Sequence, residues 1–157
     1  MATEGYEIYD WDSEIESDDS GFTLLPEEVC AFEVVKLDKE FYGGGKNAPA
    51  CPRAKVSMRA TAPDGTSAII TDSFLLYSGM EWKISAFFRA IGYKQHGQKV
   101  RMKWDEDWLK GQKGTLKVKH REFTFTQGNK AGEKGLANEV DYYIDAETGA
   151  GADGEGW

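Results

Sequence analysis

Two stretches of the chain alternate between apolar and polar residues, which is typical of half-buried β-strands. They run from Arg53 to Thr61 and from Gly114 to Phe125. Further strands are predicted at about 28–37, 67–77 and 137–144, where β-branched and aromatic residues lie between loops. The pattern therefore predicts five strands in total.

One segment shows helical periodicity instead. Between 79 and 91, four large apolar residues fall on a single face: Ile84, Phe87, Phe88 and Ile91. Gly92 follows at the position of a C-terminal cap. Three strands, a helix and two more strands, joined by short turns, predict a mainly β fold, specifically a five-stranded OB-fold barrel.

The two ends of the chain differ in composition from its middle, and 157 residues suit one domain with tails. We expect an acidic N-terminal arm over 1–20, the OB-fold domain over 21–145, and an acidic, flexible and disordered C-terminal tail over 146–157. The first and last of these segments are poor in apolar residues that could form a core.

The net charge of −8 conceals a strong asymmetry. Residues 1–28 hold ten acidic residues and residues 139–157 hold six, and neither segment has a lysine or arginine. The segment between them carries a net charge of +8. Because charges act over about 8–10 Å at ordinary salt, this central body favours an anionic partner.

Candidate catalytic and metal-binding motifs are weak. The run Gly43-Gly44-Gly45-Lys46 lacks the Ser/Thr of a phosphate-binding loop and precedes no helix. Four residues could in principle bind zinc, but their wide spacing favours four unrelated residues: Cys30, Cys51, His96 and His120. We expect a protein that is not an enzyme and has no metal site and no cofactor.

The compartment follows from three further features. The N-terminus has neither a basic residue nor an apolar stretch, and no apolar run approaches the ~20 residues that span a bilayer. Two cysteines are too few for a disulfide framework. We therefore expect a cytoplasmic protein with reduced thiols and no membrane contact.

Basic residues on the polar faces of the two alternating strands are the candidate binding site. Lysine and arginine neutralise phosphates, and aromatic rings stack on bases. The candidates are Arg53, Lys55 and Arg59 on one strand, and Lys117, Lys119 and Arg121, followed by Phe123 and Phe125, on the other. The alternative is that half-exposed strands normally place charged residues on the solvated side.

Two glycine-rich loops would flank such a face in an OB-fold. The first contains Tyr42 and Lys46, and the last contains Lys130. We expect all three to contact the ligand, although Tyr42 could instead fold back onto the barrel.

Several segments resemble small single-stranded-DNA-binding proteins encoded by bacteriophages. They are Gly21–Pro26, Val34–Lys36, Trp82, Phe87–Gly92 and Gly111–Gly114. The resemblance implies an OB-fold, a role in phage DNA replication or recombination, and the cytoplasm of a host bacterium. The chain end also resembles acidic tips that recruit other replication proteins, which implies such a role for Asp153, Glu155 and Trp157.

We therefore expect binding and protection of single-stranded DNA without sequence preference, with replication or recombination proteins as further partners. The alternative is a protein-interaction module that acts through its acidic termini.

Overall fold

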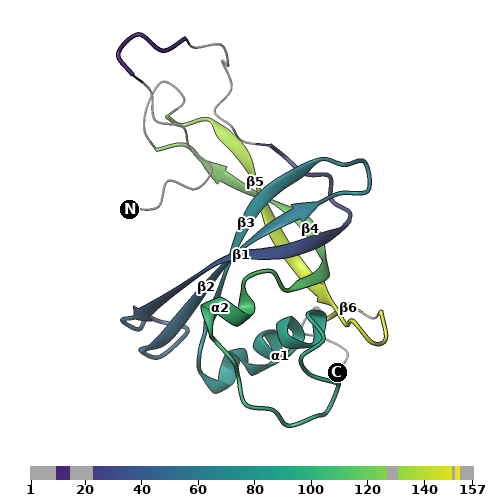
Figure 1. Cartoon of the computed structure of the whole chain (residues 1–157). Helices are drawn as coiled ribbons and strands as arrows, with labels where there is room; N and C mark the ends of the chain where they lie inside the picture. The colour runs from purple at the N-terminus through teal and green to yellow at the C-terminus, as the bar shows by residue number, and fades with distance from the viewer. Residues whose placement is uncertain (1–9, 15–22, 127–130, 150, 153–157) are drawn as a thin grey trace.

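A computed structural model describes residues 10–14, 23–126, 131–149 and 151–152. The chain forms a curved antiparallel sheet in the order β3-β2-β1-β4-β5-β6, with its helices gathered at the lower end in Figure 1. The fold is therefore mainly β and resembles a barrel.

The first three strands follow one another as antiparallel neighbours. They are β1 (Val29–Tyr42), β2 (Cys51–Thr61) and β3 (Ser67–Leu75). The alternation predicted for β2 is confirmed, because the side chains of Ala54, Val56, Met58 and Ala60 are buried. β1 is longer than predicted, and its bulge at Val34–Lys36 changes which side chains face the core.

The last strands are β4 (Lys113–Thr124), β5 (Lys134–Ile144) and the short β6 (Gly151–Ala152). β4 lies beside the first part of β1, and β5 lies beside β4. β4 approaches α1 closely at Gly114, where a Cβ atom would lie 2.7 Å from the carbonyl oxygen of Ala90. Only glycine fits this contact without displacing its neighbours.

Three short helical segments lie between β3 and β4: a 3-10 turn (Ser78–Met80), α1 (Glu81–Ala90) and α2 (Glu106–Leu109). The predicted apolar stripe of α1 is confirmed, because Ile84, Phe87 and Phe88 are buried. Gly92 adopts a positive φ of 80°, and its amide donates to the Arg89 carbonyl, as expected for a helix end.

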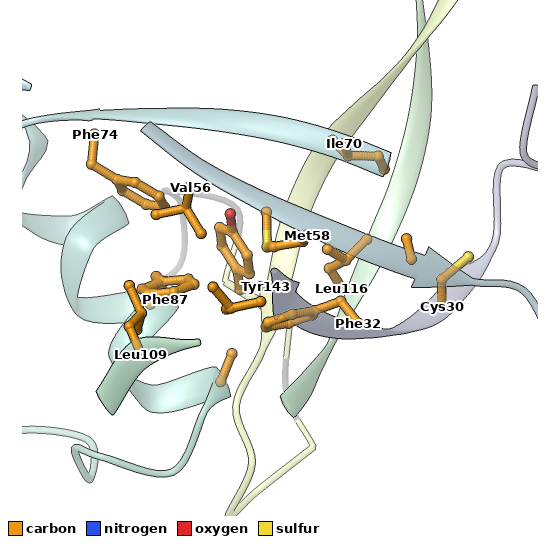
Figure 2. Packing of buried hydrophobic residues seen from close by; sticks show 14 of the residues in the cluster. Cys30, Phe32, Val56, Met58, Ile70, Phe74, Phe87, Leu109, Leu116 and Tyr143 are labelled. Atoms are coloured by element: carbon orange, nitrogen blue, oxygen red, sulfur yellow. The ribbon is translucent and has the colours of Figure 1, made fainter. Parts of the chain in front are cut away.

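The core lies between the curved sheet and α1. Figure 2 shows the rings of Phe32, Phe74, Phe87 and Tyr143 gathered there, and the Phe87 and Tyr143 rings meet edge to face at 5.5 Å. Trp104 packs parallel to Phe87 from the connecting segment, with ring centroids 6.0 Å apart. These contacts attach the helices to the barrel end.

No ladder of backbone hydrogen bonds joins β3 to β5 in the described part of the chain, so the sheet is not closed. Side chains bridge this seam instead. The Tyr143 hydroxyl donates to Oδ2 of Asp72 at 2.6 Å, and Lys83 Nζ lies 2.7 Å from Oδ1 of the same residue. Burial, followed by the charge of Asp72, raises the pKa of Tyr143 well above its usual value.

Part of the segment predicted as a disordered tail belongs to the fold. Asp145 is buried, and its carboxylate accepts hydrogen bonds from the amides of Glu147 and Thr148. The same carboxylate lies 3.6 Å from the guanidinium of Arg89 on α1. β6 then pairs with β5, so a boundary at residue 146 does not separate the tail from the domain.

Candidate functional site

The outer face of the sheet carries most of the predicted site residues. Every second residue of β2 points away from the core, including Arg53, Lys55 and Arg59. On β4 the same face carries Lys117, Lys119 and Arg121. We call the side chains of β1–β5 that point away from the core the outer face.

The basic residues of β2 and those of β4 form two rows on the outer face. The rows lie end to end along β1 and not side by side across it. β1 lies between β2 and β4, and its register shows where each row is placed. Lys117 lies beside Val29 at the start of β1, whereas Arg53 lies beside Glu40 near its end. Those positions are separated by roughly 35 Å of strand. This arrangement depends on the register of β1 with its two neighbours, which the alternation of single strands does not predict.

One carboxylate on the neighbouring strand β1, that of Glu40, pairs with two of the three cations of the β2 row. Arg53 Nη2 lies 2.6 Å from Glu40 Oε1, and Lys55 Nζ lies 3.8 Å from Glu40 Oε2. The hydrogen bond from Arg53, helped by the charge of Lys55, holds the pKa of Glu40 below its usual value. This part of the outer face is therefore less positive than the β2 sequence alone suggests.

The β4 row has a similar arrangement with β5. Lys117 Nζ lies 3.8 Å from Asp141, and Glu139 lies 3.7 Å from Lys119 Nζ and 3.0 Å from Arg121 Nε. All these side chains are partly exposed, and exposed ion pairs of this kind contribute little to stability. A phosphate can therefore replace a carboxylate partner at small cost.

Arg59 differs from the other strand cations. It is exposed, lies between Ile69 and Glu33 in the register, and forms no ion pair with a carboxylate in the described residues. It also lines a shallow hollow with Asp107 and Gly111. Arg59 is therefore the predicted strand cation most available to an anion.

The aromatic side chains predicted to stack on bases are only partly exposed. Phe123 and Phe125 meet edge to face with centroids 4.8 Å apart, and both rings lie over Gly135 of β5. Their side chains are half-buried, so part of each ring is covered by its own hairpin. Tyr42 is also half-buried, and its hydroxyl lies against Gly45 in the first loop.

The remaining predicted residues divide into two groups. Lys46 is exposed in the loop after β1 and has no ion pair within the described ranges. Lys130, Asp153, Glu155 and Trp157 lie outside the residues that the structure describes, as does most of the acidic arm.

The zinc alternative gains no support. Cys30 and Cys51 are buried on separate strands, and burial raises the pKa of the Cys30 thiol. His120 contacts the carbonyl oxygen of Leu25 at 2.6 Å. In the described part of the chain, no three histidine, cysteine or acidic residues group as a metal site would require.

A third group of cations, which was not among the predicted site residues, lies on the segment between α1 and α2. From Ile91 to Trp104 the chain has no acidic residue but contains Lys94, Lys99, Arg101 and Lys103. None of the four forms an ion pair with a described carboxylate. The sequence signal for this group is the absence of acidic residues from the segment. The predicted site residues were chosen by strand alternation and flanking loops, which do not include this segment.

A scan of protein-family models finds no match, and a search of curated proteins finds no significantly similar chain. The helices of the described ranges are all too short or too polar to cross a membrane.

Proposed function

We propose that this protein binds single-stranded DNA without sequence preference, on an OB-fold, and acts by binding rather than by catalysis. The connectivity supports the OB-fold: three consecutive antiparallel strands, a helix, then β4 beside β1 and β5 beside β4. The side-chain bridge from Tyr143 to Asp72 joins the two strands that would close such a barrel.

One observation carries the proposal: cations occupy alternate positions on two strands of the outer face, interrupted on β2 by Ser57, with aromatic rings at both ends. Arg53 and Lys55 lie at the Tyr42 end of β1, and Lys119 and Arg121 lead to Phe123 at the other end. This spacing suits a flexible phosphate backbone, because each cation can reach a different phosphate while rings stack on bases.

The proposed role in phage DNA replication or recombination, in a bacterial cytoplasm, rests on the family resemblance. Under this proposal the acidic C-terminal residues recruit other replication proteins. The rows of exchangeable cations on the outer face make direct DNA contact the favoured primary activity over interaction through acidic termini alone.

The test is binding of fluorescent oligo-dT at two salt concentrations. Arg59→Glu should weaken binding and flatten the dependence on salt, because one phosphate contact is lost. Lys39→Glu is a matched control, since Lys39 is an exposed cation on the opposite side of the same hairpin, beside Ala54. Absence of binding to any single strand at low salt would reject the proposal and leave the interaction module.

A further inference from the structure

A hollow on the underside of the barrel lies between α1 and the segment 94–102. Its volume is about 390 Å³, within the ~300–1,000 Å³ range of small-molecule sites. Its wall combines apolar and ring atoms with a few polar groups: Leu76, Tyr77, Ile84, Phe88, Val100 and Met102, with Ser78, Ser85, Glu81 and Lys94. We call it the α1 pocket.

Tyr77, which lines the α1 pocket, follows closely on a residue of β3 that neighbours the outer face. Leu75, two residues earlier, lies beside Arg53 in the β2–β3 register. The Tyr77 hydroxyl donates to the carbonyl oxygen of Asn47 in the first loop at 3.4 Å, while Tyr77 also lines the pocket. The pocket wall therefore includes a residue two positions along the chain from the neighbour of Arg53.

The charge around the α1 pocket suits a phosphate backbone. Val100 and Met102 line the pocket and alternate with Lys99 and Arg101, which are exposed. Lys94 lies in the wall, and its Nζ donates to the Gln95 carbonyl rather than to a carboxylate. These cations have no carboxylate to displace, unlike Arg53 or Lys119.

We propose that the α1 pocket takes one nucleotide of the bound strand, with its base against Tyr77 and Met102 and its phosphates beside Lys94, Lys99 and Arg101. This inference rests on the proposed function and extends the DNA path from the outer face around the end of the barrel. A nucleotide fits because the site combines a ring-lined wall with cations that form no ion pair with a described carboxylate.

Two variants distinguish the contribution of base contacts to affinity from that of phosphate contacts. Ser85→Phe fills the pocket from α1 and should weaken oligonucleotide binding roughly 5- to 150-fold, as lost stacking does, without changing the salt slope. Lys94→Ala should instead reduce the slope of log affinity against log salt concentration by about one, because one phosphate contact is lost. Lys39→Glu serves as the control, and thermal melting confirms that each variant is folded.

Cross-linking of an oligonucleotide that contains 5-iodouracil gives a direct readout. Cross-links in the peptides around Tyr77 and Met102, lost in Ser85→Phe, would support the proposal. Full binding with cross-links only on the outer face would overturn it while leaving the proposed function intact. If Ser85→Phe spares DNA binding but weakens binding of a peptide of residues 146–157, the pocket belongs to that peptide. Failure of any strand to bind would overturn both proposals.

Discussion

Opposite charges meet in two different settings in this protein. Arg89 and Asp145 are almost completely buried where α1 meets the C-terminal turn, whereas Arg53 and Glu40 lie on the partly exposed outer face. Both pairs join a guanidinium to a carboxylate. Their consequences differ, because burial removes the water that would otherwise solvate an unpaired charge.

This difference separates the parts that hold the fold from those that can exchange partners. A buried charge that loses its partner has no water to replace it, so Asp145 is a structural residue. An exposed cation can exchange a carboxylate for a phosphate with little change in stability. The outer face can therefore hold ion pairs in the free protein and still bind DNA.

The largest effect is expected at the buried pair. Asp145→Ala removes the carboxylate that lies 3.6 Å from the buried Arg89 guanidinium, and it removes the acceptor of two turn amides. We expect the free energy of unfolding, measured with urea, to fall by about 3–5 kcal/mol.

The matched control is the double variant Arg89→Met with Asp145→Leu, which removes both charges. Because no charge is left buried, its loss should be clearly smaller than that of Asp145→Ala. Equal losses would show that the turn hydrogen bonds, rather than the buried charge, dominate.

An intermediate effect is expected at the seam between β3 and β5. Tyr143→Phe removes the hydrogen bond to Asp72 but keeps the ring, so it should cost about 1.5–3 kcal/mol. DNA affinity of the folded variant should be unchanged, because the hydroxyl is buried.

The same residue gives a dependence on pH. The pKa of Tyr143 is raised in the folded state, so above about pH 10 the unfolded chain releases a proton that the folded protein retains. Stability is therefore complete below pH 10 and falls as pH rises toward the folded pKa. Urea midpoints at several alkaline pH values should show a shallower fall in Tyr143→Phe, and parallel profiles would contradict this.

The smallest effect on stability is expected at Glu40. Glu40→Gln removes an exposed carboxylate, so the unfolding midpoint near neutral pH should hardly change. DNA affinity at low salt should rise by up to about fivefold, because Arg53 and Lys55 no longer share a negative partner. Unchanged affinity, with Arg59→Glu still weakening binding, would place the DNA path away from this end of β1.

The sequence by itself determined most of the elements, together with the inward faces of β2 and α1. The inward residues of β2 and the stripe of α1 are dictated by periodicity, because a strand repeats every two residues and a helix every 3.6. Gly92 ends the helix for a similarly local reason, since its positive φ suits glycine. The candidate cations on β2 and β4 could also be predicted, because alternation assigns them to the solvated face.

Only the tertiary structure decided what these cations meet. The pairing of Glu40 with Arg53 and of Glu139 with Arg121 depends on strand register, as does the end-to-end arrangement of the two basic rows. In the sequence, nothing distinguishes Tyr143 from other strand tyrosines. Its hydrogen bond to Asp72, 71 residues away, is formed only in the folded protein. The α1 pocket also forms only in the folded protein, because its wall comes from the residues just after β3, from α1 and from the segment 94–102. Such features arise between distant segments, and periodicity describes each segment alone.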